Sequence, residues 1–243
     1  MITSKQNQLI KKIRSLENKK FRDLENLYVV EGIKMVNEAV KLGQTVEYIV
    51  CTQSVVSQIF AKDYEITIVT DEIFHYLSTE VSPQGALAVI SKPQLNLTSP
   101  KDSCLLLDGV SDPANVGAII RTAVASGYKD LYLINCADAY SPKAVRASMS
   151  GIYGVNVYTG NHDEVFNVVD LPLIVADMGG ENVFNFSLNE KFCLVIGNEA
   201  HGVSQRVREI SKYVVSIPME KGMESLNASV SAGILMYALK NKF

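Results

Sequence analysis

The chain has 243 residues, which is enough for one large domain or two modest ones with a buried core. Its 47% hydrophobic and 20% charged residues are typical of a globular protein and argue against disorder and fibrous folds. No apolar run approaches the ~18 residues of a membrane-spanning helix, and the polar N-terminus lacks the apolar segment of a secretory signal. We therefore expect a cytoplasmic protein without a membrane anchor.

The formal net charge of −3 is unevenly distributed. Residues 1–22 hold 7 basic side chains and 1 acidic side chain, which leaves 16 basic and 25 acidic residues, a net charge of −9, for the rest of the chain. This basic segment is either an arm that contacts the phosphates of a nucleic acid or a solvated amphipathic helix. The candidate contact residues are Lys11, Lys12, Arg14 and Arg22.

The cysteines predict buried, reduced thiols rather than a metal site. They include no C-x-x-C pair, and three of them lie in apolar, strand-like runs. Such thiols are typical of a cytosolic protein, and we expect no metal ion. The residues are Cys51, Cys104, Cys136 and Cys193.

The N-terminal third of the chain predicts a small α/β unit. A helix is expected over residues 5–20, a strand over 27–31, and a second helix over 34–42 that ends at Gly43, because glycine readily adopts a left-handed cap. The prolines and polar residues of 92–102 indicate a linker. Between them, β-rich runs at 46–51, 66–69 and 87–90 alternate with helical stretches near 54–61 and 71–78.

Strands and helices alternate again after the linker. Near-continuous apolar strands between amphipathic helices are typical of a parallel sheet covered on both faces. We therefore predict an α/β domain of residues 1–94, a linker of residues 95–103 and a second α/β domain of residues 104–243. The strands expected in the second domain cover 104–108, 131–134, 155–158, 173–176, 193–196 and 214–217, and its helices lie near 116–126, 142–149, 203–211 and 227–240.

Three polar segments follow strands of the second domain, at the edge where α/β sheets bind ligands. In the first segment, Asp112-Pro113 predicts an extended turn, and Asn115 is placed to cap the next helix. Arg121 lies away from the apolar stripe of that helix. It is either a surface residue in an ion pair or a group that holds a phosphate with its bidentate fork.

The second segment runs from Gly197 to Gly202, with Glu199 between the two glycines. It is either a tight turn before a helix or a glycine loop that holds a polar ligand, with Glu199 as a hydrogen-bond acceptor. The pattern is neither G-x-G-x-x-G nor a P-loop, so the common dinucleotide and nucleoside triphosphate sites are not indicated.

The third segment begins with Ile217-Pro218-Met219, where free carbonyls and an apolar wall suit the face and amino edge of an adenine. Ser225, Asn227 and Ser229 then lead into the last helix. One of them would suffice as a helix cap, and the excess of polar side chains favours a binding site.

The three segments resemble, in their order and separations, the motifs of the TrmH/SpoU family of SPOUT-class RNA ribose 2′-O-methyltransferases. Asn115, Gly117 and Arg121 match the first motif, residues 197–202 the second, and residues 217–229 the third. The N-terminal unit resembles, more weakly, the substrate-binding domain of family members that act on ribosomal RNA. That weaker match rests on Ser4, Asn7, Lys11, Arg22 and residues 30–32, and one departure in the second domain is Ser150, where the family usually has glycine.

The resemblance implies a SPOUT-type parallel sheet with a C-terminal trefoil knot, preceded by a small α/β RNA-binding domain. It also implies a homodimer and S-adenosyl-L-methionine as cofactor. A guanidinium stays protonated, so Arg121 would act as an electrostatic and phosphate-positioning group rather than as a base, with Glu199 orienting it or the ribose. The implied catalytic residues are Arg121, Asn115, Glu199, Ser225 and Asn227, and the implied cofactor-binding residues are Gly197, Gly202, Ile217, Met219, Leu226, Asn227 and Ser229.

The function implied in this way is an RNA 2′-O-ribose methyltransferase that acts on 23S ribosomal RNA. Two alternatives stay open at this stage: a tRNA 2′-O-methyltransferase, and a non-catalytic RNA-binding protein of the same fold that assists ribosome assembly. The presence of Arg121, Asn115 and Asn227 together argues against the non-catalytic alternative, because binding alone would not require all three.

Overall fold

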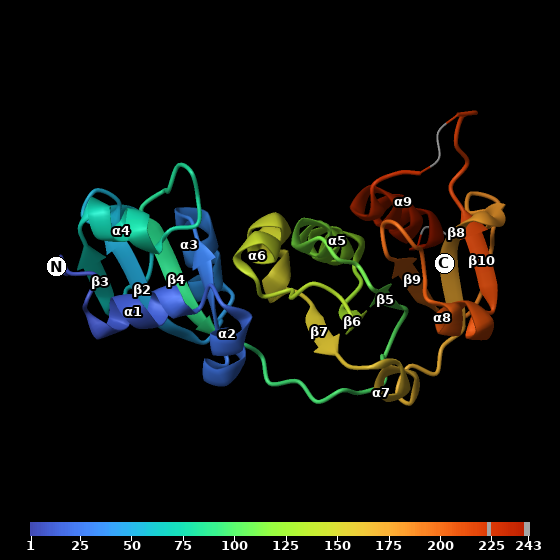
Figure 1. The fold of residues 1–243 in the computed structure, drawn as a ribbon, viewed down its shortest axis with the longest axis horizontal. Coiled ribbons are helices and arrows are strands. Elements are labelled where there is room, and N and C mark those ends of the chain that lie inside the picture. The colour runs from blue at the N-terminus through green and yellow to red at the C-terminus, as the bar shows by residue number, and fades with distance from the viewer. Residues whose placement is uncertain (223–224, 241–243) are drawn as a thin grey trace.

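The computed structural model describes residues 1–222 and 225–240, which form two β-sheets at opposite ends of the molecule (Figure 1). The N-terminal sheet has four strands in the order β1-β4-β2-β3. Helices α1 and α4 pack on one of its faces and α3 on the other. The elements are α1 (Gln8–Ser15), α2 (Lys19–Glu25), β1 (Leu27–Glu31), α3 (Ile33–Lys41), β2 (Val46–Thr52), η1 (Val56–Gln58), β3 (Ile66–Val69), α4 (Asp71–Leu77) and β4 (Ala86–Ser91).

Two helix predictions in this domain are wrong. The helix expected over residues 5–20 is two helices, because the first ends at its C-cap Leu16 and the Asn18 side chain caps a second one by accepting from the Lys20 amide. The helical stretch expected near residues 54–61 is only the single turn η1.

The C-terminal sheet has six strands in the order β10-β8-β9-β5-β6-β7, and all its pairs are parallel, as the apolar strands predicted. Helices α5, α6 and α9 cover one face, and α7 and α8 cover the other. The elements are β5 (Cys104–Asp108), α5 (Pro113–Ser126), β6 (Asp130–Ile134), α6 (Pro142–Ser148), η2 (Met149–Tyr153), β7 (Asn156–Thr159), α7 (His162–Phe166), β8 (Leu173–Asn182), β9 (Cys193–Gly197), α8 (Gln205–Ile210), β10 (Tyr213–Ser216) and α9 (Ala228–Lys240).

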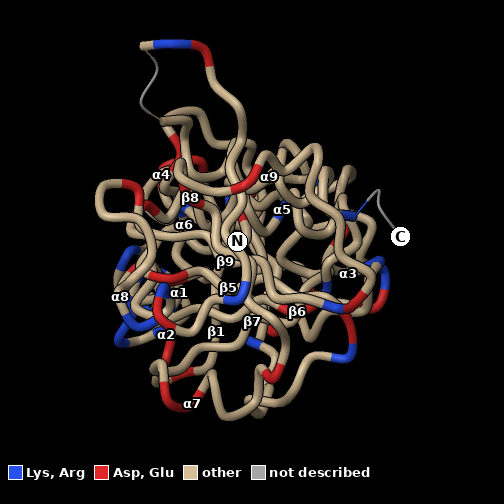
Figure 2. The backbone as a smooth tube through the Cα atoms, turned by 90° about the vertical axis from the view of Figure 1, so that its right-hand side faces the viewer, with Lys and Arg blue, Asp and Glu red and all other residues tan. Residues whose placement is uncertain are grey.

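The strand order reverses next to β5, and this reversal fixes where ligands can bind. From β5 the chain moves outward through β6 to β7, and it then fills the other side with β8, β9 and β10. A parallel sheet leaves a crevice at the carboxyl ends of the strands at such a reversal, here between β5 and β9. Residues 217–222, which follow β10, extend away from the sheet (Figures 1 and 2).

A buried ion pair joins the two domains. The Arg22 guanidinium is 3% exposed, lies 2.6 Å from the Asp138 carboxylate and donates to the backbone carbonyls of Leu16 and Glu17 at 2.7 Å. Arg22 was expected to contact RNA, and this prediction is wrong because its donors are used inside the protein.

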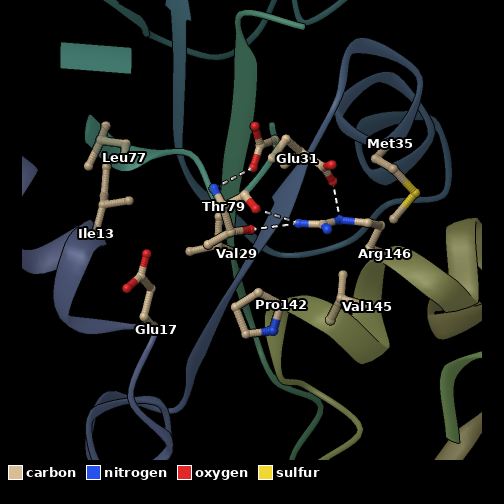
Figure 3. Close-up of a pocket in the computed structure, with 11 residues that line it drawn as sticks. Ile13, Glu17, Val29, Glu31, Met35, Leu77, Thr79, Pro142, Val145 and Arg146 are labelled. Atoms are coloured by element: carbon tan, nitrogen blue, oxygen red, sulfur yellow. Dashed lines mark hydrogen bonds and ion pairs between the residues drawn. The ribbon is translucent and has the colours of Figure 1, made fainter. Parts of the chain in front are cut away.

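A second link between the domains involves α6. Arg146 reaches the loop after α4, where it donates to the Thr79 hydroxyl at 2.8 Å and to the Thr79 carbonyl at 3.1 Å, and it pairs with Glu80 (Figure 3). The Tyr153 hydroxyl in η2 donates to the Met35 carbonyl of α3 at 3.1 Å. Because these contacts come from different elements, they fix the orientation of α6 and η2 against the N-terminal sheet.

No helix within the described ranges is long and apolar enough to cross a membrane. All four cysteines are free thiols, and three of them are buried.

Candidate active site

The three predicted segments converge at the carboxyl ends of β5, β9 and β10. The first segment enters α5 at Asp112, whose side chain accepts from the Ala114 amide at 3.0 Å, with Pro113 at the first helical position. Asp112, not Asn115, is therefore the cap. Asn115 lies inside the first turn of α5 and is 7% exposed.

Glu199 holds the first segment in place. Its Oε1 accepts from the Asn115 Nδ2 at 2.9 Å and from the Asp112 amide at 3.3 Å, and its Oε2 accepts from the Ser111 hydroxyl at 3.0 Å and from the Ser111 amide at 3.2 Å. The interpretation of Glu199 as the group that orients Arg121 does not match this geometry, since all four hydrogen bonds go to the loop before α5 and its first turn.

These hydrogen bonds keep the Glu199 carboxylate ionised. Partial burial would raise its pKa, but the hydrogen bonds from Asn115 and from backbone amides outweigh burial and lower the pKa from 4.5 to about 2. Glu199 is therefore an anion at neutral pH, and it acts as the acceptor that joins the second segment to the first.

Asn227 joins the third segment to the same network. Its Nδ2 donates to the Asn115 Oδ1 at 3.0 Å, while its Oδ1 caps α9 by accepting from the Ser229 amide at 2.9 Å and from the Val230 amide at 3.3 Å. Asn115 thus accepts a hydrogen bond from Asn227 and donates one to Glu199. One chain of side-chain hydrogen bonds connects all three segments, although they lie far apart in the sequence.

The loop between β9 and α8 is closed by Asn198 and two glycines. The Asn198 Nδ2 donates to the Gly109 carbonyl at 2.8 Å, and its Oδ1 accepts from two amides of its own loop. A Cβ at Gly197 would lie 2.3 Å from the Gly202 carbonyl carbon, and Gly202 itself has a φ of +68°. Glycine is therefore required at both positions, at the first for space and at the second for backbone conformation.

A cavity of ≈ 480 Å³ opens beside this loop. This volume is within the range of small-molecule sites. The predicted cofactor residues that line it are Gly197, Gly202, Ile217, Met219 and Leu226, together with Ser225.

Asn227 and Ser229 are not among the described residues that line the cavity. The Asn227 amide faces Asn115, and the Ser229 hydroxyl donates to the Asn227 Oδ1 at 2.6 Å. Both residues shape the entry of α9 from outside the cavity. Two charged residues that sequence reasoning missed, Asp177 and Arg208, do line it. No local motif marks them, because a change of register between β8 and β10 brings Asp177 to the cavity and Arg208 reaches it from α8.

Arg121 is exposed on α5, and its side chain has no hydrogen-bond or ion-pair partner among residues 1–222 and 225–240. A Cβ at Gly151 would lie 2.9 Å from the Arg121 Cα, so η2 packs directly on the α5 backbone there. The backbone of Arg121 is thus fixed while its guanidinium remains available for a ligand.

A buried carboxylate that sequence reasoning also missed ties the site to α7 and α8. Asp108, at the end of β5, is 4% exposed and accepts from the Ser204 amide at 2.6 Å. The His162 Nε2 lies 3.2 Å from both the Asp108 carboxylate and the Ser204 hydroxyl. The sequence held one signal for this part of the site. Asn161 and Glu164 form a capping box, which marks the start of the unpredicted helix α7 that carries His162.

The remaining basic candidates lie on α1. Lys11 is exposed, Lys12 lies 3.0 Å from Glu25, and Arg14 pairs with Glu17. The hydrogen bond from Lys12 to Glu25 raises the pKa of Lys12, so this side chain stays charged. Within residues 1–222 and 225–240, no three or more histidine, cysteine or acidic side chains lie together in a group that could bind a metal ion.

The fold and the site define an α/β protein that binds a small molecule at the carboxyl edge of a parallel sheet, between glycine-containing loops, with an unpaired arginine nearby. More specifically, residues 102–237 match the SpoU rRNA Methylase family, and the chain belongs to this family. Residues 7–88 match the MRM3-like substrate binding domain.

Individual relatives cover nearly the whole chain. The 23S rRNA (guanosine(2553)-2'-O)-methyltransferase RlmP of Bacillus subtilis is 29% identical over 98% of this chain and 98% of its own. A TrmH-family protein from Porphyromonas gingivalis is 30% identical over the full length of both chains, with a TM-score of 0.87. The SpoU methyltransferase AviRb from Streptomyces viridochromogenes, solved in complex with the cofactor AdoMet, is 25% identical over 97% of this chain and 98% of its own, also with a TM-score of 0.87.

Proposed function

We propose that this protein is an S-adenosylmethionine-dependent RNA ribose 2′-O-methyltransferase that acts on 23S ribosomal RNA. The observation that carries the proposal is the hydrogen-bonded chain Asn227–Asn115–Glu199, which ties together three loops beside a small-molecule cavity and joins them to α5, the helix that carries the exposed Arg121. Membership of the SpoU family and full-length similarity to a 23S rRNA 2′-O-methyltransferase support the substrate.

The cavity suits S-adenosylmethionine in size and chemistry. Ile217, Met219 and Leu226 offer an apolar wall with backbone groups for an adenine, and the loop at Gly197 allows a ligand to approach the backbone without a Cβ in the way. The similarity to AviRb, whose structure contains AdoMet, supports the same cofactor here. When bound, S-adenosylmethionine supplies a methyl group on a positively charged sulfur.

The residues of the site have two further roles, which are to stabilise charge and to position the reacting groups. A ribose 2′-hydroxyl is barely acidic, so the negative charge that develops on its oxygen must be stabilised. Arg121 supplies a permanent positive charge for this oxygen or for the adjacent RNA phosphate. Asn115, Glu199 and Asn227 touch one another rather than Arg121, and we assign them to holding the first loop and α5 in the reactive position.

We assign RNA binding to the N-terminal domain, residues 1–94, joined by residues 95–103 to a catalytic domain of residues 104–243. The match to a substrate binding domain supports this division. On α1, the exposed Lys11 and the half-buried Lys12 and Arg14 are the phosphate contacts that we retain, and Arg22 serves the domain interface instead. We place the reaction in the cytoplasm, in keeping with the free thiols.

We further propose that the protein is a homodimer with a C-terminal trefoil knot. An exposed apolar stripe supports the dimer: Val230 and Tyr237, two helical turns apart on α9, are 50% and 45% exposed, and Val124 on the adjacent α5 is 37% exposed. The path of the chain supports the knot: β10 lies at one edge of the sheet, and Asn227, which follows it, is hydrogen-bonded to Asn115 at the start of α5. Size-exclusion chromatography with light scattering tests the dimer, and Tyr237→Glu should shift it to monomer.

The central test incubates the protein with transcribed 23S rRNA and S-adenosylmethionine labelled on the methyl group, and maps sites of resistance to alkaline cleavage, which requires a free 2′-hydroxyl. The wild type should label ribose, and Arg121→Ala should abolish transfer while RNA binding stays largely intact. Arg206→Ala, which removes an exposed arginine paired with Asp163 on the opposite face, is the matched control and should retain activity.

Three results would contradict the proposal. Label on a base would exclude ribose chemistry, and full activity of Arg121→Ala would exclude the assigned role of this residue. Label in tRNA but not in 23S rRNA would establish the tRNA alternative instead.

A further inference from the structure

An irregular pairing of β8 with β10 builds one wall of the cavity. The two strands pair in register at Val175 and Val214, but the next residue of β10, Val215, pairs with Glu181. Residues 176–180 of β8 are therefore skipped in the pairing register with β10. Gly180 returns the chain to the sheet by packing against the β10 backbone, where a Cβ would lie 2.5 Å from the Val215 carbonyl carbon.

This bulge brings a carboxylate to the cavity wall. Asp177 lines the cavity and is 28% exposed, and its Oδ2 lies 2.6 Å from the Arg208 guanidinium of α8. Its Oδ1 has only a long contact of 3.5 Å, from the Gly179 amide. Glu199 is the other acidic residue among the described lining residues, and its oxygens already hold the first loop. Asp177 is thus the carboxylate with acceptor capacity left for a ligand.

The strand order decides which part of the ligand meets Asp177. In the proposed reaction the methyl group faces helix α5, which follows β5 and carries Asn115 and Arg121. β8 lies on the other side of β9 from β5, so the bulge borders the end of the cavity away from the reacting atoms. The nucleoside of S-adenosylmethionine belongs at that end. It carries a vicinal diol, and two hydroxyl donors on adjacent carbons match the acceptors of one carboxylate, as in ribose recognition by other α/β proteins.

We propose that Asp177 binds the ribose hydroxyls of the cofactor and that Arg208 is a positioning residue for Asp177, an inference that rests on the proposed function. The Arg208 guanidinium also reaches the glycine loop, where it comes within 3.9 Å of the position of a Gly202 Cβ. Arg208 therefore spans the side of the cavity from the bulge to the loop, and it holds the carboxylate through Oδ2 while leaving acceptor capacity on Oδ1.

Isothermal titration with S-adenosylhomocysteine tests this assignment without relying on activity. Asp177→Asn should raise the Kd by about 10- to 100-fold, the loss expected for hydrogen bonds to a charged acceptor. Arg208→Gln should cause a smaller loss, and the double variant should bind no more weakly than Asp177→Asn because the two residues act together. Asp163→Asn is the matched control, since it removes a carboxylate from an ion pair outside the cavity, and it should bind like the wild type.

A second ligand makes the test specific for the diol. The wild type should bind the 2′,3′-dideoxy analogue of S-adenosylhomocysteine more weakly than S-adenosylhomocysteine itself, by a factor similar to the effect of Asp177→Asn. The Asp177→Asn variant should bind the two ligands with the same Kd. This comparison in the wild type holds even if a variant fails to fold. Equal binding of both ligands by the wild type, or an equal effect of Asp177→Asn on both ligands, would overturn the inference. A wild type that binds neither ligand would overturn the proposed function as well.

Discussion

Replacement of Glu199 by glutamine tests whether this carboxylate is the joint between the loops. Glutamine has the same shape, but one of its terminal groups is an amide donor that must face either Asn115 and the Asp112 amide or the Ser111 hydroxyl and amide. Two hydrogen bonds are lost in the first orientation, and at least the one from the Ser111 amide is lost in the second, where the Ser111 hydroxyl can turn to accept. The side chain is exposed, so water replaces part of the loss, and we expect the free energy of unfolding to fall by about 1–2 kcal/mol. This corresponds to a decrease in Tm of about 2–8 °C.

The effect should depend on pH in a defined direction. The pKa of Glu199 is lowered from 4.5 to about 2 in the folded protein, so its contribution is complete above pH 4.5 and is lost as the pH falls towards 2. The difference in Tm between wild type and Glu199→Gln should therefore be largest at pH 7 and clearly smaller at pH 3. Thermal denaturation followed by circular dichroism measures both values, with Glu190→Gln, an exposed carboxylate paired with Lys212, as the control. A difference that is absent at pH 7, or unchanged at pH 3, would refute the reasoning.

Two further substitutions follow from buried geometry. Arg22→Ala should lower the free energy of unfolding by about 3–5 kcal/mol, because it leaves Asp138 without its ion-pair partner. Lys20→Ala, on the surface of the same helix, should change this free energy by less than about 0.5 kcal/mol. Urea denaturation measures both variants, and equal effects would contradict the interface role of Arg22. Gly197→Ala should abolish detectable S-adenosylhomocysteine binding in a titration, because its Cβ would collide with the backbone at Gly202 at 2.3 Å, and wild-type affinity would show that the loop is not packed in this way.

Local sequence signals were sufficient for most of the strands and for the three loops. The strands at residues 27–31, 66–69 and 104–108 match their predicted bounds, because each is a short apolar run between polar or glycine residues. Helix ends were harder to predict. Residues 5–20 have a continuous amphipathic pattern, and the break at Leu16–Asn18 arises where a second cap competes with that pattern. The five-residue helix α7 was missed because it is too short to show a periodicity.

The sequence by itself determined that the chain has parallel apolar strands and three loops rich in glycine and polar residues, since strand propensity, turns and glycine requirements depend on neighbouring residues. Tertiary structure alone decided which partner each polar side chain has. It buried Arg22 against Asp138, 116 positions away, and it connected Asn227 to Asn115 across 112. It also placed Asp177 at the cavity through a change of register between two strands. Such pairings depend on how separate elements pack, and no local pattern encodes them.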